Sequence, residues 1–126
     1  MKGYGPEGGE RGPRIAGVTT FLRLPHVTQY DDVDVAVVGL PFDTGLAVRT
    51  GARFGPRAVR EASLTLHPTY NPAQRVAVFD RLSVVDGGDA RVIAGFTDRS
   101  LEAMQSALSQ VHEAEAVPLG IGGDQT

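Results

Sequence analysis

Three short apolar runs alternate with two helix-forming segments, and this alternation is the feature that most narrows the fold. Residues 33–40 are rich in β-branched side chains and nearly continuously apolar, which is typical of a strand covered on both faces in a parallel sheet. Shorter runs follow at 82–85 and 117–121. The order strand, helix, strand, helix, strand predicts an α/β protein with a parallel sheet and helices on its faces.

The first intervening segment has the spacing of an amphipathic helix. Pro56 suits a first helical turn, where a missing N–H costs little. Val59, Ala62 and Leu66 then fall three and four residues apart, which predicts one apolar stripe facing the sheet. Pro68 is expected to end this helix, because its ring cannot continue one.

The second intervening segment predicts a longer helix. Thr97 or Asp98 is expected to cap its first turn, since both side chains accept hydrogen bonds from free backbone N–H groups. Apolar residues then recur at helical spacing and predict the buried stripe: Leu101, Met104, Leu108 and Val111.

Length and composition indicate one domain or part of one. The chain has 126 residues, of which 41% are hydrophobic. Residues 1–14 are rich in glycine, proline and charge, and they predict a flexible or surface-lying arm. Residues 15–126 are expected to form the α/β unit.

Charge and composition also exclude several classes of function. The formal net charge of −3 gives no basic face for nucleic acid. The chain contains no cysteine, so disulfides and thiolate metal sites are excluded. No apolar run is long enough to cross a membrane, and the amino terminus lacks the apolar core of a secretory signal. We therefore expect a cytoplasmic protein without nucleic-acid or membrane partners.

Chemistry in parallel α/β sheets is located at the carboxyl ends of the strands. Three segments lie there in this chain, at 41–54, 86–89 and 122–126. The first contains Asp43, Arg49 and Arg53. The two arginines could bind a substrate carboxylate, or they could brace the loop by pairing with Asp43, and the bracing role is favoured on physical grounds.

The other two segments contribute further carboxylates. Asp86 and Asp89 flank two glycines; paired carboxylates can hold a divalent metal or transfer protons, but they also cap turns, and turn and supporting roles are favoured. Asp124 follows two glycines at the rim of the last strand. The three histidines show no spacing to acidic residues that indicates metal binding: His26, His67 and His112. Phosphate-binding, dinucleotide-binding and serine-hydrolase motifs are absent from the sequence.

Four segments in this order resemble the ureohydrolase family of arginases and agmatinases, and the agmatinases most closely. They are residues 16–25, residues 37–45 with the loop at 49–56, the Val-Val-Asp-Gly-Gly-Asp segment at 84–89, and Gly-Ile-Gly-Gly-Asp at 120–124. Each segment is common alone, but the ordered set is specific.

The resemblance implies a three-layer α/β/α arginase-like fold around a parallel sheet, of which this chain holds the amino-terminal part. It implies two manganese ions whose bridging hydroxide attacks a guanidino group, of agmatine or a similar small substrate, and releases urea. A bound divalent ion makes hydroxide available at neutral pH. Family members form homo-oligomers, so the resemblance implies such partners.

The sequence departs from the family pattern at two positions and also in extent. Gln125 stands where the family has a histidine metal ligand, and an amide oxygen binds manganese more weakly than imidazole. Thr50 replaces a proline. The remaining family ligands would lie beyond Thr126, so we expect a truncated chain that is inactive alone. A non-catalytic interaction module derived from the family is the alternative. The last strand is expected to be an unpaired edge that favours aggregation.

Overall fold

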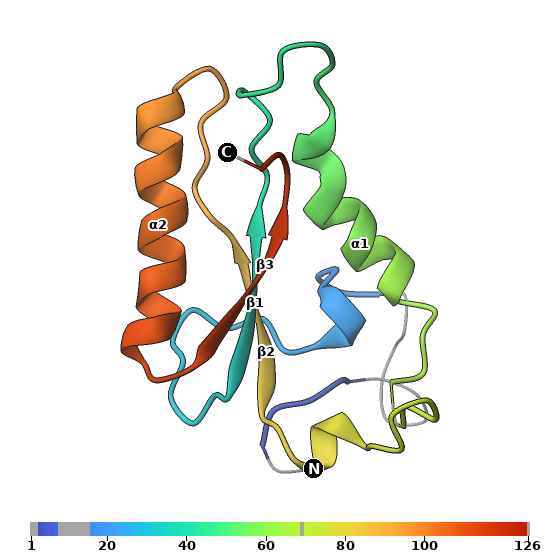
Figure 1. Ribbon diagram of the computed structural model, residues 1–126. Helices are drawn as coiled ribbons and strands as arrows, with labels where there is room; N and C mark the ends of the chain where they lie inside the picture. Colours follow the sequence, from blue (N-terminus) through green and yellow to red (C-terminus); the bar gives the residue numbers. More distant parts are fainter. Residues whose placement is uncertain (1–2, 8–15, 69, 126) are drawn as a thin grey trace.

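A single parallel sheet forms the centre of the molecule (Figure 1). The computed structural model describes residues 3–7, 16–68 and 70–125. The strands are β1 (Val35–Leu40), β2 (Val84–Asp89) and β3 (Val117–Gly122), and their order in the sheet is β2-β1-β3. Both neighbouring pairs are parallel, which confirms the prediction from the alternating pattern.

The helices α1 (Gly55–Ser63) and α2 (Thr97–Glu113) cover opposite faces of the sheet and complete three layers (Figure 1). This placement follows from the right-handedness of crossover connections, because the step from β1 to β2 and the step from β2 to β3 run in opposite directions along the sheet. The described residues also form three 3-10 turns: η2 (Phe21–Arg23), η3 (Ala52–Phe54) and η4 (Val78–Asp80).

The sheet carries one apolar cluster on each face. Ala36, Val38 and Val85 pack against Val111 on the α2 side. Val37 and other residues pack on the α1 side with the segment that contains Leu24. Alternate residues of β1 therefore serve opposite clusters, which explains why this strand is apolar at almost every position.

The predicted apolar stripe on α1 is wrong. Val59 and Leu66 are 40% and 54% exposed, and the helix ends at Ser63, before Pro68. The buried face instead consists of Pro56, Arg60 and Ser63. Its polar character has a physical reason, because this face lies over the carboxyl end of β2 and over η2, where charged and backbone partners are available.

The start and buried face of α2 also differ from the prediction. Phe96 occupies the cap position and no side chain caps the first turn, so the expected cap at Thr97 or Asp98 is wrong. Val111 is fully buried, whereas Leu101 is 37% exposed. Ser100 is fully buried. Its hydroxyl accepts a hydrogen bond from the N–H of Ile93 and donates one to the C=O of the same residue, which satisfies the buried group.

The two edges of the sheet are covered unequally. The outer edge of β2 is occupied by amino-terminal segments, since Val84 N–H donates to Tyr4 C=O at 2.9 Å and Asp86 N–H donates to Pro25 C=O at 3.0 Å. Within the described part of the chain, β3 has β1 as its only strand partner.

Of the predicted arm, residues 1–2 and 8–14 lie outside the described residues. Among the residues that are described, no helix has the length and apolar character needed to cross a membrane.

Candidate functional site

The carboxyl ends of β1, β2 and β3 meet at one edge of the sheet, as the parallel order requires. The Asp-Gly-Gly-Asp segment was expected to follow its strand, but it forms the last four residues of β2. The pairing shifts by one residue there, from Val37 opposite Asp86 to Gly39 opposite Asp89. An irregularity of this kind redirects side chains at a strand end.

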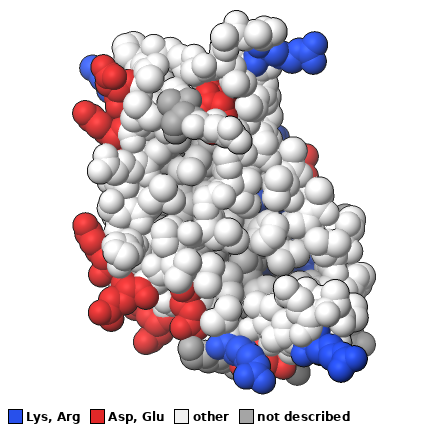
Figure 2. All heavy atoms as spheres, viewed as in Figure 1, with Lys and Arg blue, Asp and Glu red and all other residues white. Residues whose placement is uncertain are grey.

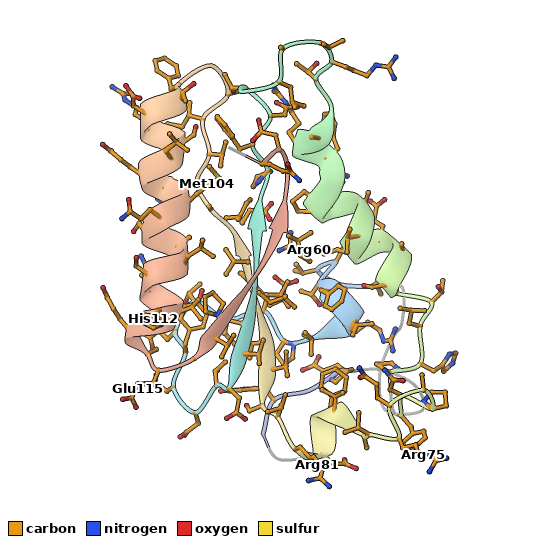
Figure 3. The ribbon with its side chains drawn as sticks, in the orientation of Figure 1. Arg60, Arg75, Arg81, Met104, His112 and Glu115 are labelled. Carbon is orange, nitrogen blue, oxygen red and sulfur yellow. The ribbon has the colours of Figure 1, made fainter. Side chains whose placement is uncertain are left out.

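Arg60 links both carboxylates of β2 to helix α1 (Figure 3). Its Nε and Nη2 donate to the two oxygens of Asp86, each at 2.9 Å, and its Nη1 donates to Asp89 at 2.6 Å. Nη2 also donates to the carbonyl of Gly88 at 3.0 Å. Sequence reasoning missed Arg60, because its partner lies 26 residues away and no local pattern marks a buried arginine.

Asp86 is fully buried and fully satisfied. Besides Arg60, its carboxylate accepts hydrogen bonds from the N–H of Phe21 at 2.8 Å and from the N–H of Gly88 at 2.9 Å. Gly39 leaves room for the Asp89 side chain, which a Cβ at position 39 would strike. Asp86 and Asp89 thus act here as anchors for α1, for η2 and for the end of their own strand.

The first loop is braced by an ion pair between Asp43, which is buried, and Arg53, which is partly exposed. Asp43 accepts from Arg53 Nε at 2.8 Å and pairs with Arg53 Nη2 at 2.7 Å, and it also accepts from the N–H of Gly51 at 2.7 Å. The hydrogen bond from Arg53, followed by that from Gly51, lowers the pKa of Asp43 to about 2. The bracing alternative is therefore the one that the contacts support. Arg49 is exposed on the same loop.

The last turn of the chain is docked onto this loop. Asp124 N–H donates to the carbonyl of Phe42 at 2.7 Å, and Asp124 Oδ2 accepts from the N–H of Gly45 at 3.2 Å. Gly123 has φ +61°, and a Cβ there would collide with the carbonyl oxygens of Leu40 and Phe42. Gln125 follows directly and is exposed, and the docked turn before it holds its backbone beside the first loop.

The donors present do not fit a two-metal centre. The described residues contain no group of three or more His, Cys, Asp or Glu side chains placed to hold a metal ion. Asp86 and Asp89 bind Arg60, and Nδ1 of His26 lies 3.1 Å from the carbonyl of Asp86. Asp124 is engaged with the first loop. The metal role of Gln125 and the supporting roles of the aspartates stay predictions.

A cavity of about 810 Å³ opens beside β2 on the α2 side, and sequence reasoning gave no sign of it. Its lining is polar and apolar in about equal parts, and the polar residues include Thr20, His26, Tyr30, Asp89 and Gln110. Burial, with a smaller contribution from the Asp86 carboxylate, raises the pKa of Tyr30. The cavity shares Asp86 and Asp89 with the carboxyl edge but not Asp43 or Asp124.

The parallel sheet between two helices and the ordered strand-end segments define a three-layer α/β scaffold with its candidate site at the carboxyl edge. The family model described as "Arginase family" matches residues 33–126, and this chain belongs to that family. A guanidinobutyrase of Pseudomonas aeruginosa is 38% identical over 124 residues, which covers 96% of this chain and 39% of that protein.

Solved structures agree with this assignment. A hypothetical agmatinase from Burkholderia thailandensis superimposes with a TM-score of 0.82 at 34% identity, covering 96% of this chain and 37% of that one. A Trypanosoma cruzi formiminoglutamase, crystallised with Mn²⁺, gives a TM-score of 0.66 at 30% identity over 81% of this chain and 34% of its own. The expected arginase-like fold is confirmed, and the chain spans little more than a third of the length of these relatives.

Proposed function

We propose that this chain forms the amino-terminal part of an enzyme that hydrolyses the guanidino group of a small substrate to urea and an amine. The observation that carries the proposal is the convergence of three aspartate-bearing segments at one carboxyl edge, in a chain that belongs to the arginase family. Agmatine and guanidino acids are the substrate classes, because relatives of both kinds match the chain. A cytoplasmic location and assembly into homo-oligomers belong to the same proposal.

Manganese is the proposed cofactor of the complete enzyme, where a bound divalent ion would supply hydroxide at neutral pH. The donors among the described residues do not hold such a centre, so we assign these residues a positioning role. Arg60 fixes the end of β2, and the Asp43–Arg53 pair fixes the loop onto which Asp124 docks. The substrate-loop role of Arg49, whose side chain is exposed beside this brace, belongs to the proposal.

Urea release tests the proposal. The 126-residue chain, alone and joined in frame to the remainder of the P. aeruginosa guanidinobutyrase, would be assayed with Mn²⁺ against agmatine and 4-guanidinobutyrate. We expect no urea from the chain alone and urea from a fusion carrying Gln125→His. The fusion that retains Gln125 should be slower, because an amide is the weaker ligand. Turnover by the chain alone, or a folded Gln125→His fusion inactive on both substrates, would contradict the proposal.

A non-catalytic interaction module is the second candidate function. Gln125 favours it, because a lost ligand is tolerated when catalysis is not required. The two functions differ in a measurable way, since a module would bind a family member without restoring urea release in either fusion.

A further inference from the structure

The cavity beside β2 lies away from the first loop and the last turn. It has a volume of about 810 Å³ between the end of β2, helix α2 and residues 18–30, and neither Asp43 nor Asp124 lines it. In the view of Figure 1 and Figure 2, β3 lies nearest the viewer, and the charged side chains of that face lie mostly at its margins. The cavity lies instead at the β2 edge of the sheet. Its volume is within the range of small-molecule sites.

The two glycines of β2 shape one wall of this cavity. A Cβ on Gly87 would lie 2.5 Å from the hydroxyl oxygen of Tyr30, and a Cβ on Gly88 would lie 2.9 Å from Cε1 of His26. Gly88 also has φ +77°, a conformation that favours glycine. The Gly-Gly pair therefore lets the side chains of His26 and Tyr30 close onto bare backbone.

His26 and Tyr30 have complementary hydrogen-bonding characters. Nδ1 of His26 lies 3.1 Å from the carbonyl oxygen of Asp86. A carbonyl can only accept, so the neutral ring carries its proton on Nδ1 and leaves Nε2 as an acceptor. Burial raises the pKa of Tyr30, so its phenol stays protonated at neutral pH and can donate. These two lining residues thus offer one acceptor and one donor.

Thr20 adds a hydroxyl that the protein leaves without a partner. The residue lines the cavity and is only 6% exposed. Its side chain does not cap the turn η2 that follows it, and its hydroxyl has no hydrogen-bond partner among the described residues. No fully enclosed side-chain nitrogen or oxygen in the same residues lacks a partner, so this hydroxyl is reachable from the cavity. Buried hydroxyls are usually satisfied by a bound group.

The charges of the lining balance one another. Two arginines and two aspartates line the cavity, and Arg60 is already bound to both aspartates. The lining therefore favours an ion of neither sign. Its other polar groups are hydroxyls, an amide and an imidazole, and apolar side chains of β1 and α2 stand beside them: Val38, Ala103 and Ala107. A matching ligand is uncharged, with several hydrogen-bonding groups and an apolar face.

We propose that this cavity binds an uncharged cyclic polyol, the sugar ring of a free monosaccharide or of a nucleoside. Ring hydroxyls both donate and accept, so they suit Thr20, His26 and Tyr30 together. The C–H face of the ring packs against the alanines of α2. The site is independent of guanidino hydrolysis, because the first loop and the last turn take no part in it.

An amide NMR titration of the 126-residue chain tests the site. D-Ribose, adenosine and adenine serve as ligands, of which adenine lacks the sugar. We expect the Gly87 and Gly88 amide signals to move saturably with ribose or with adenosine, with a dissociation constant of about 1 mM for a ligand of this size. The tighter of the two identifies the source of the ring. Adenine should bind more weakly than adenosine.

Three variants locate the binding. Thr20→Val removes the hydroxyl at nearly constant volume and should weaken binding by about tenfold. Ala103→Leu fills the cavity from α2 and should abolish binding. Thr65→Val, exposed and outside the lining, should leave the dissociation constant unchanged. Circular dichroism verifies that all three variants keep the fold.

Each outcome decides the proposal. Saturable binding that Thr20→Val and Ala103→Leu weaken and Thr65→Val does not supports the site, whether or not a fusion releases urea. Binding that both cavity variants leave unchanged lies elsewhere and overturns it, as does no binding of ribose or adenosine up to their solubility limits. Adenine binding as tightly as adenosine, or ribose 5-phosphate binding more tightly than ribose, also overturns it, since the ligand recognised would then be a base or an anion.

Discussion

Arg60 donates to two carboxylates and one carbonyl at the end of β2, and Asp86 would be a buried unpaired anion without it. Breaking a buried ion pair costs more than the pair contributes, because the remaining charge has lost its solvation and its partner. Arg60→Met should therefore lower the free energy of unfolding by about 3–5 kcal/mol. Urea denaturation followed by circular dichroism measures this change.

Arg57 provides the control for that experiment. It pairs with Glu61 one helical turn away, but both side chains are well exposed. Exposed pairs of this kind contribute about 0.3–0.5 kcal/mol, so Arg57→Met should change stability by no more than about that amount. Equal losses in the two variants would show that Arg60 is not an anchor.

Asp43 should give the chain an acid-dependent stability. Its pKa is lowered to about 2, so the folded chain releases this proton more readily than the unfolded chain does. The resulting stability is fully present above the ordinary carboxyl range and is lost as the pH falls toward 2. The unfolding midpoint of the wild type should fall over this range relative to that of Asp43→Asn, and Asp98→Asn should behave as the wild type does. Parallel curves for wild type and Asp43→Asn would contradict the brace.

At the scale of the elements, the sequence predicted their order and the convergence of the strand ends, because both follow from local apolar runs and from the geometry of parallel sheets. It could not predict what each helix faces. Periodicity assumes that a buried helix face is apolar, whereas the inner face of α1 lies over Asp86 and contains Arg60 and Ser63. The docking of Asp124 onto Gly45 joins residues 79 apart, and no local signal carries it.

Residues at the two ends of the apolar stripe predicted on α2 test whether helical spacing alone predicts burial. Val111 is fully buried against the sheet, but Leu101 is partly exposed, although the sequence spacing treats them alike. Val111→Ala should cost about 2 kcal/mol, from two lost methyl groups and the cavity that they leave. Leu101→Ala should cost less than about 1 kcal/mol despite removing more atoms. Denaturant midpoints compare the stability of the two variants. A larger loss of stability in Leu101→Ala would support the apolar stripe that the sequence spacing predicts.

At the scale of the whole molecule, the sheet has one covered edge and one open edge. Amino-terminal segments pair with β2 through Tyr4 and Pro25, while β3 exposes Val117 and Leu119 as the sequence predicts for an edge strand. Among the described residues, the β3 edge is the one without a strand partner, and such an edge can pair with a further strand.

Pro118 limits the pairing of unrelated strands with the open edge of β3. Val117 N–H donates to the C=O of Asp34, which directly precedes β1, and successive residues of a strand face alternate sides. The backbone nitrogen of Pro118 therefore faces the open side of β3, where the missing N–H removes one of the donors that an unrelated strand would need. Pro118→Val restores the donor without changing the pairing to β1, so the variant should aggregate faster than the wild type when both are held at the same concentration and temperature. Static light scattering over time measures the difference. Pro72→Val removes an exposed loop proline instead and should scatter as the wild type does. If the two variants aggregate at the same rate, the proline on β3 does not protect the edge, and the exposed apolar side chains alone determine association.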